Sequence, residues 1–353
     1  MSTLANDPEF QALRAVSARA GADPLLVQAA GGNTSIKRDG ILWIKASGTW
    51  LMNALRDDIF VPVDLARLEE AVRRDDGSAE KAQDFVVTEL NPSGLRPSIE
   101  TTVHSVLPKD VVIHVHCVGT IAHAVRADAQ AVLGQRLAGL DWAFVPYVKP
   151  GLTLSRSIEA VLTPETRVII LGNHGLVVCG DTVAETEALL DEVHRRLTDA
   201  PRPQPAPDFI ALQALAQGSS YAIPADERAH GVASDADALA MAGQGSLYPD
   251  HVIFLGVGSV VAHDDETAAD VARRFADAGL PDPVSILFPG KGVLMHASAN
   301  AGAQALARCL AEVTTRIPAG TALTCLSDAQ NAELLDWDAE KYRQALNRDR
   351  AGA

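Results

Sequence analysis

Residues 96–119, RPSIETTVHSVLPKDVVIHVHCVG, are the stretch that decides the fold of the N-terminal half. Ser98 is a residue type that begins helices and Pro108 cannot continue one, so we expect a short helix between them. The β-branched residues 111–116 then predict a strand that is apolar except for two histidines. A helix that leads directly into such a strand is typical of a domain built from layers of helices and sheet.

Two hairpins are predicted on either side of this stretch. Residues 32–48, GNTSIKRDGILWIKASG, alternate apolar with polar positions around Asp39-Gly40, a dipeptide that favours a tight turn. Residues 167–180, RVIILGNHGLVVCG, contain two apolar runs joined by a polar turn. Helix-like stretches, including the charged residues 64–84, lie between them. Strands therefore alternate with helices over the first half of the chain, which predicts an α/β or α+β domain with one central sheet.

A proline-rich segment divides the chain. Residues 200–208, APRPQPAPD, contain four prolines and follow a well-patterned helix, which is typical of a linker. We therefore predict a larger domain at residues 1–199 and a smaller C-terminal α/β domain at residues 209–353. In the second domain, residues 251–261, HVIFLGVGSVV, predict an apolar strand, and residues 266–278 predict a helix.

The charge of the chain argues against several classes of partner. Its formal net charge of −15 repels nucleic acid and anionic membrane surfaces, whereas a small anionic substrate can still bind where local cations and backbone amides gather. The polar, acidic start lacks the pattern of a secretory signal, and no apolar run is long enough to span a membrane, so we expect a cytoplasmic protein. The four cysteines lie far apart and are expected to be reduced, mostly buried thiols.

Three histidines are the candidate metal ligands. His114 and His116 are two residues apart on a predicted strand, so they point to the same face about 7 Å apart at the backbone. His174 lies in a turn between two apolar strands, where a polar ring has no packing reason to be, and it supplies a third ligand. Three neutral histidines keep coordination positions open, as in catalytic zinc sites. Alternation sends Cys117 to the opposite face, so we expect it in the core.

Glu100 is the candidate proton carrier. It lies in the first turn of the short predicted helix, 14 residues before His114. A carboxylate there is commonly just a partner for the helix dipole, which is the alternative interpretation. His104 follows one turn later on the same helix face, so it is either a rival metal ligand or a side chain bonded to Glu100.

Two glycine-containing loops are candidate substrate-binding segments. Residues 29–37, AAGGNTSIK, and residues 45–49, KASGT, combine glycines with short polar side chains. Glycines let backbone amides approach a ligand, and the hydroxyl and amide groups are of the kind that surround a phosphate or a sugar hydroxyl. The spacing alone favours plain turns, because it matches neither a P-loop nor a dinucleotide fingerprint. Residues 288–293, FPGKGV, also lack the pattern of a P-loop, so neither ATP nor NAD is predicted.

Taken in order, GGNTSIK, SGT, PSIETTVH, HVH and NHGLVV resemble the class II aldolase/adducin family, and in particular the aldolase portion of bifunctional rhamnulose-1-phosphate aldolase/alcohol dehydrogenase proteins. Residues 247–254, 288–295 and 327–342 also look like the C-terminal part of that portion, and these 353 residues contain no counterpart of the reductase half. The resemblance implies a three-layer domain with a central, mainly antiparallel sheet. It also implies a homo-oligomer, usually a tetramer.

The resemblance assigns roles residue by residue. It makes His114, His116 and His174 the ligands of Zn²⁺ or another divalent metal, and Glu100 the acid/base. It places a substrate or phosphate cradle on five residues, namely Gly32, Asn33, Ser47, Gly48 and Ser98. Ile99 stands where sugar-phosphate aldolases of the family often have a second serine, which removes one phosphate donor.

The activity that the resemblance implies is that of an aldehyde-lyase, which cleaves a keto-sugar or keto-sugar phosphate by retro-aldol chemistry through a metal-bound enediolate. A sugar-phosphate dehydratase or epimerase using the same metal site is the alternative, and a non-catalytic, adducin-like module is the third hypothesis. Members tend to use a tyrosine of a neighbouring subunit as proton donor; the motifs assign none of the four tyrosines of this chain to that role, and Tyr147 is one candidate. Lys37, Lys45 and Arg96 are candidates for neutralising an anionic end of the substrate, although lysines and arginines are more often solvated surface charges.

Overall fold

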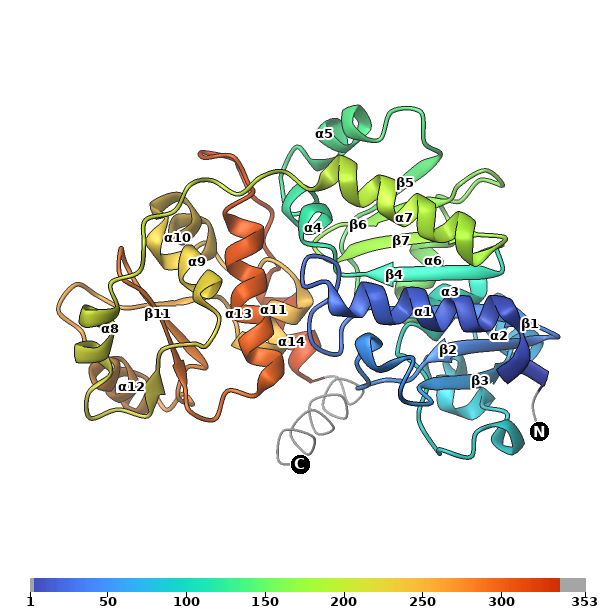
Figure 1. Cartoon of the computed structure of the whole chain (residues 1–353), viewed down its shortest axis with the longest axis horizontal. Helices are drawn as coiled ribbons and strands as arrows, with labels where there is room; N and C mark the ends of the chain where they lie inside the picture. Colours follow the sequence, from blue (N-terminus) through green and yellow to red (C-terminus); the bar gives the residue numbers. More distant parts are fainter. Residues whose placement is uncertain (1–2, 337–353) are drawn as a thin grey trace. The chain divides into compact units, whose positions relative to one another are not determined.

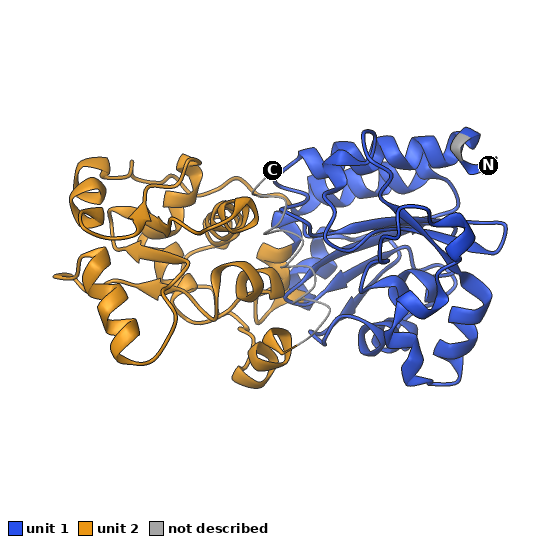
Figure 2. Ribbon diagram, turned by 90° about the horizontal axis from the view of Figure 1, so that it is seen from below, with its two compact units in different colours: residues 1–120, 130–197 blue, residues 121–129, 198–353 orange. Residues whose placement is uncertain are grey.

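The computed structural model describes residues 3–336 and separates into two compact units (Figures 1 and 2). One unit contains Met1–Thr120 and Gln130–Leu197, and the other contains Ile121–Ala129 and Thr198–Ala353. The predicted domain limits at residues 199 and 209 stay a prediction. The ends of the predicted second domain and of the motif at 327–342 lie outside the described residues.

A seven-stranded sheet forms the centre of the first unit, in the order β3-β2-β1-β4-β7-β6-β5. Neighbouring strands are antiparallel except β5 and β6, which are parallel. The predicted fold class, an α/β domain with a mainly antiparallel central sheet, is thereby confirmed. The strands are β1 (Asn33–Arg38), β2 (Ile41–Lys45), β3 (Phe60–Asp64), β4 (Val111–Val115), β5 (Trp142–Val145), β6 (Val168–Leu171) and β7 (Gly175–Gly180).

Both predicted hairpins are present. Asp39 and Gly40 have φ values of 51° and 77°, and they join β1 to β2. Two consecutive residues with positive φ form the type of tight turn whose twist matches that of the flanking strands. The second hairpin joins β6 to β7 through a turn in which Asn173 has a φ of 52°. This turn carries one of the candidate metal ligands, His174.

Helices cover both faces of the sheet, which gives the first unit its three layers (Figure 1). Helices α1 (Pro8–Ala22) and α7 (Val183–Leu197) pack together on one face, and α2 (Leu65–Arg73), α3 (Thr101–Val106) and α6 (Leu152–Glu159) group on the other. The remaining helices before residue 198 are α4 (Val118–Ala124), α5 (Ala129–Arg136), and the 3-10 turns η1 (Thr3–Asn6), η2 (Leu51–Asn53), η3 (Gly77–Glu80), η4 (Ala82–Phe85) and η5 (Thr88–Leu90).

The predicted helix at 64–84 is only partly correct, because α2 ends at Arg73. Asp75 then adopts a φ of 55°, which an α-helix does not tolerate, and short 3-10 turns follow. Asp64 begins α2 as its cap, since its side chain accepts a hydrogen bond from the Arg67 amide at 3.1 Å. The charged residues beyond Arg73 therefore form a loop with short 3-10 turns and not a continuation of the helix.

An apolar cluster fixes α3 and α6 against the sheet. Val103 and Leu107 pack against strand residues such as Val112 and Val177, all of them at most 1% exposed. Burying a side chain of this size contributes about 1.5–3 kcal/mol. This packing matters for function because α3 follows Glu100 directly in the sequence.

The second unit contains a four-stranded sheet in the order β8-β11-β10-β9. Strands β9 and β10 are parallel and the other pairs are antiparallel. The strands are β8 (Tyr221–Ala222), β9 (Val260–Val261), β10 (Ser285–Phe288) and β11 (Gly292–His296). The helices are α8 (Phe209–Ala216), η6 (Glu227–His230), α9 (Gly231–Ser234), α10 (Ala236–Ala242), α11 (Pro249–Leu255), α12 (Ala268–Asp277), α13 (Ala301–Thr314) and α14 (Asp328–Leu335).

The predicted strand at 251–261 is wrong over most of its length. Residues up to Leu255 belong to helix α11, and only Val260–Val261 form a strand. Pro249 occupies the first turn of α11, where its fixed φ favours a helix, and Gly256 ends the helix with a φ of 98°. Every residue of α11 is buried, so its run of apolar residues shows no alternation with a solvent face.

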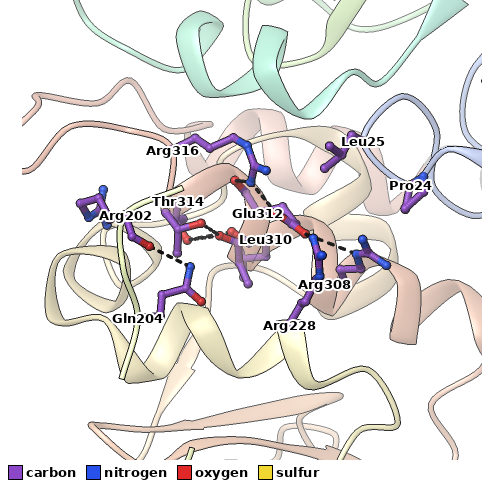
Figure 3. Close-up of polar contacts among 12 residues, drawn as sticks. Pro24, Leu25, Arg202, Gln204, Arg228, Arg308, Leu310, Glu312, Thr314 and Arg316 are labelled. Carbon is purple, nitrogen blue, oxygen red and sulfur yellow. Dashed lines mark hydrogen bonds and ion pairs between the residues drawn. The ribbon is translucent and has the colours of Figure 1, made fainter. Parts of the chain in front are cut away.

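A charged network joins α13 to η6 in the second unit (Figure 3). Glu312, only 5% exposed, accepts hydrogen bonds from Arg228 at 3.0 Å and from Arg316, and Arg308 lies 3.5 Å away. Burial raises the pKa of Glu312, but the hydrogen bonds from Arg228 and Arg316 outweigh it and hold the pKa below its ordinary value. The carboxylate therefore stays ionised among three guanidinium groups.

All four cysteines are free, and three of them are buried, as expected. Over residues 3–336, none of the helices combines the length and apolar character that crossing a bilayer requires.

Candidate metal centre

The candidate site lies where three neighbouring strands meet at one end of the central sheet. Asn33, at the start of β1, pairs with His114 on β4, and Val115 pairs with Leu176 on β7. The turn between β6 and β7 opens at the same end, because Leu171 pairs with Gly175. The antiparallel register therefore brings together segments that are far apart in the sequence.

The structure brings all three predicted ligands together. One ring nitrogen from each of His114, His116 and His174 lies within 4.8 Å of those of the other two. The ring centroids are 4.9 to 5.0 Å apart, and each side chain is at most 6% exposed. Cys117 is not part of this group; it is fully buried, and its thiol lies 3.3 Å from His194 Nδ1.

The hydrogen bonds of His114 suit metal ligation. Its Nδ1 lies 3.0 Å from the carbonyl oxygen of Leu176, which can only accept, so Nδ1 carries the proton. The other ring nitrogen, Nε2, then carries no proton and lies 3.2 Å from Nε2 of His116. Fixing one imidazole nitrogen on a carbonyl while the other faces the ion is how proteins orient histidine ligands. The three residues fit a divalent ion such as zinc.

Glu100 lies against the histidine cluster from the N-cap position of α3. Its Oε2 is 3.3 Å from Nε2 of His114, and its Oε1 is 3.6 Å from Nε2 of His174. Oε1 is buried and accepts no hydrogen bond from the described residues. Burial raises the pKa of Glu100, but the positive charge that His114, His174 and His116 carry when protonated, together with a hydrogen bond from Asn33, lowers it to about 2. A cationic cluster therefore keeps Glu100 ionised.

A chain of buried hydrogen bonds leads away from Glu100. Asn33 donates from Nδ2 to Glu100 Oε2 at 2.8 Å and to Ser98 Oγ at 3.1 Å. The other end of the Asn33 amide, Oδ1, is bonded to His104 Nε2, and His104 Nδ1 lies 2.6 Å from Ser35 Oγ. Burial, followed by the charge of His114, lowers the pKa of His104 to about 3, so its ring is neutral.

His104 therefore has neither of the two roles considered for it from the sequence. It lies outside the group of three converging histidines, and its bonds go to Asn33 and Ser35 instead of Glu100. The sequence held a clue to this arrangement. Ser35 is two residues after Asn33 on a strand, and His104 is four residues after Glu100 on a helix, so each pair shares a face.

The predicted cradle residues lie around one buried lysine. Lys45 Nζ donates to the carbonyl oxygens of Ala30 and Gly32 at 2.8 and 3.0 Å, and the Lys45 carbonyl accepts from the Ser98 amide at 3.1 Å. Gly32 has a φ of 61°, and a Cβ there would lie 2.8 Å from the His114 carbonyl oxygen. No other residue fits this close approach without moving the metal-site strand.

The second loop is tied to the same region through backbone contacts. The Ser47 amide donates to the Arg96 carbonyl at 2.9 Å, and Gly48 has a φ of 72°. Ser47 and Ser98 are 9% and 5% exposed. The roles of the five cradle residues in binding a substrate stay predictions, as does the role of Tyr147.

Lys37 and Lys45 are both engaged by backbone carbonyl groups. Lys37 Nζ donates to the carbonyl oxygens of Ser105, at 3.1 Å, and Leu107, at the C-terminal end of α3. Burial lowers the pKa of Lys37 below its ordinary value. These contacts give both lysines a structural role in holding α3 and the Gly32 loop.

The unit that holds this buried cluster is a domain of a known family. The family model described as "Class II Aldolase and Adducin N-terminal domain" matches residues 12–198, more than half of the chain. The chain therefore belongs to the class II aldolase/adducin family.

Individual relatives extend this comparison. The chain is 29% identical over 221 residues to a Bacillus subtilis (strain 168) protein described as "Uncharacterized oxidoreductase YuxG", which corresponds to 56% of this chain and 32% of that relative. The chain thus spans about a third of the length of this curated relative. It is also similar to the solved N-terminal class II aldolase domain of a conserved Thermoplasma acidophilum protein (26% identity, 54% of this chain, 92% of that chain, TM-score 0.47). A further similar structure is an L-fuculose-1-phosphate aldolase from Thermus thermophilus. The sequences are 19% identical, and the match covers 60% of this chain and 97% of that chain with a TM-score of 0.37.

Proposed function

We propose that this chain is a divalent-metal-dependent aldehyde-lyase that cleaves a keto-sugar or keto-sugar phosphate by retro-aldol chemistry. The observation that carries the proposal is a single buried group in which the nitrogens of His114, His116 and His174 converge next to the carboxylate of Glu100. Three neutral ligands leave the charge of an ion uncompensated and leave room for substrate oxygens. A module that only binds other proteins has no need for such a group.

The three histidines and Glu100 have separate roles in the proposed reaction. A divalent ion held by His114, His116 and His174 would polarise the substrate carbonyl and stabilise the negative charge that develops on its oxygen. Glu100 returns a proton to the carbon next to that carbonyl in cleavage and removes it in condensation. Its Oε2 is held by Asn33, so Oε1, which accepts no hydrogen bond from the described residues, is the atom that exchanges the proton.

The loops around Lys45 support an oxygen-rich, anionic or hydroxylated substrate. Lys45 shapes the Gly32 loop by binding its carbonyl groups, so that backbone amides and not the ammonium group are left to meet the substrate. Backbone amides and the hydroxyl groups of Ser47 and Ser98 suit a phosphate or sugar hydroxyls. Because Ile99 replaces a second serine, the site contributes one hydroxyl fewer to a phosphate than many aldolases of the family.

We further propose that this chain corresponds to the aldolase portion of a bifunctional rhamnulose-1-phosphate aldolase/alcohol dehydrogenase. The support is the agreement of its motifs with that portion and its match to 32% of a longer protein whose description is that of an oxidoreductase. The match covers 221 residues of this chain, and the larger part of that relative lies outside it. A homo-oligomer is part of the same proposal.

Product analysis tests the proposed reaction. Metal-loaded protein is incubated with a panel of ketose phosphates and free ketoses, and the products are separated and identified. A lyase yields an aldehyde and a shorter ketone in equal amounts. A dehydrated product or an epimer would instead assign the alternative chemistry, and the absence of any turnover over the whole panel would contradict an enzyme acting on this substrate class.

A further inference from the structure

We propose that His104 is a positioning residue for the proton carrier. Acting through Asn33, it determines which oxygen of Glu100 is held and which one faces the histidine cluster. The inference rests on the proposed function, because it concerns the same carboxylate. His104 is a buried histidine that lies outside the group of three converging histidines, and its hydrogen bonds go to Asn33 and Ser35.

The direction of the hydrogen bonds follows from the two contacts of the Asn33 NH2 group. Its Nδ2 donates to Glu100 Oε2 at 2.8 Å and to Ser98 Oγ at 3.1 Å, so the amide nitrogen faces Glu100. The carbonyl oxygen of Asn33 then faces His104 and also only accepts, so His104 Nε2 must carry the ring proton. The bare Nδ1 of the neutral ring therefore accepts from the Ser35 hydroxyl at 2.6 Å.

This series of hydrogen bonds keeps the side-chain amide of Asn33 from rotating by half a turn, which would exchange the places of its oxygen and nitrogen. In the opposite orientation, the carbonyl oxygen of Asn33 would face the Glu100 carboxylate and its NH2 group would face the N–H of His104. The bond to Glu100 Oε2 would be replaced by a repulsive pair of oxygens, and the bond to His104 would survive only if the ring moved its proton to Nδ1; each buried polar group left unpaired costs about 1–3 kcal/mol. Asn33 and Glu100 are at most 5% exposed, and Ser35 and His104 are fully buried.

The fixed amide in turn fixes the carboxylate. Asn33 holds Glu100 Oε2 and also donates to Ser98 Oγ at 3.1 Å, while Ser98 Oγ accepts from the Glu100 amide at 3.2 Å. Oε1 is thereby kept 3.6 Å from His174. Without His104, the carbonyl oxygen of Asn33 loses its partner, only the bonds of the NH2 group still orient the amide, and the position of Oε1 is held less strictly. Misplacement of a reacting group by about 1 Å can reduce a rate about 10²-fold.

The kinetic test compares three variants of the metal-loaded, full-length protein. His104→Leu removes the donor, whereas His104→Gln has a terminal NH2 that can still donate to Asn33 Oδ1. Thr102→Val is the matched control, because Thr102 lies on the same helix, is 2% exposed, and its hydroxyl has no hydrogen-bond partner in the described chain. We expect His104→Leu to lower kcat about 10- to 100-fold with little change in KM or metal content, His104→Gln to recover most of this loss, and Thr102→Val to match the wild type.

A second measurement needs no substrate. Nitrogen-15 NMR of the metal-loaded wild type at neutral pH should show His104 as the neutral tautomer protonated at Nε2. Asn33→Ala should disturb the resonances of both ring nitrogens.

The outcomes separate this inference from the proposed function. An Nδ1–H tautomer or an imidazolium at His104 overturns the positioning role, whatever the enzyme does. The role is also overturned if His104→Leu keeps the kcat of the wild type, if Thr102→Val loses as much activity, or if His104→Gln is no better than His104→Leu. If the wild type cleaves no ketose at all, the proposed function fails, and the NMR result still decides whether His104 holds Asn33 in this orientation.

Discussion

Replacing Glu100 with glutamine separates the proton carrier from the metal ligands. The amide has nearly the size of the carboxylate, and its carbonyl oxygen can still accept the 2.8 Å hydrogen bond from Asn33. Its NH2 group would then occupy the place of Oε1, which accepts no hydrogen bond from the described residues and so loses none. The structure therefore predicts a folded variant with its histidine cluster intact.

Chemistry should fail in this variant because an amide cannot exchange a proton near neutral pH. Loss of a general acid/base typically costs about 10²- to 10⁴-fold in rate, or about 3–5 kcal/mol of transition-state stabilisation. We expect kcat to fall by this factor while metal content, measured by elemental analysis, and thermal unfolding stay close to those of the wild type.

Two results would refute this reasoning in different ways. Loss of metal from Glu100→Gln would make Glu100 a ligand and close the position that a substrate oxygen needs. Wild-type turnover would place the proton carrier elsewhere, although Glu100 is the carboxylate in contact with His114 and His174.

Further predictions concern the metal, the fold and the assembly. Purified protein should carry about one divalent ion per chain, and His114→Ala and His174→Ala should each lower this content in elemental analysis; unchanged content in both would show that the site is misassigned. Gly32→Ala should destabilise the protein by at least about 2 kcal/mol in denaturant unfolding and reduce metal content, because its φ is 61° and the new Cβ would press on the His114 carbonyl. His251 is buried and its pKa is lowered to about 4, so the unfolded chain takes up a proton there before the folded chain does, and stability is lost as the pH falls below about 6.5. Between pH 7 and pH 5 the wild type should therefore lose about 2 kcal/mol more stability than His251→Gln, and equal losses in urea titrations would contradict the assignment. Light scattering at micromolar concentration should show a homo-oligomer, and a monomer would count against the family-based proposal.

The turn and the strand near the candidate metal site were predictable because their sequence patterns are local. Asp39-Gly40 sets its own turn, and the alternation around His114 places the histidines on one face of β4 whatever the rest of the chain does. The prediction of a strand at residues 251–261 was wrong because a short apolar run does not distinguish a buried strand from a buried helix. Helix α11 is buried on all sides.

The contacts between segments could not be predicted from the sequence alone. Ser35 and His104 are 69 residues apart in the sequence, and only the pairing of β1 with β4 and the packing of α3 bring them together. The buried bonds of Lys45 to the Gly32 loop have the same origin, since a lysine in a sequence gives no indication that backbone carbonyls will surround it. Residue identity and spacing therefore predicted which three histidines converge, and the fold determines what holds them.

The most direct test of the central claim is hydrogen exchange on the ketone fragment alone in heavy water, followed by proton NMR. With metal-loaded wild type, we expect stereospecific replacement of one hydrogen on the carbon next to the carbonyl by deuterium. The exchange should stop when the metal is chelated, resume when it is restored, and be absent in Glu100→Gln. A wild type that cleaves ketoses but exchanges no hydrogen, or a Glu100→Gln variant that exchanges as fast as the wild type, would contradict a metal-dependent aldolase with Glu100 as its proton carrier.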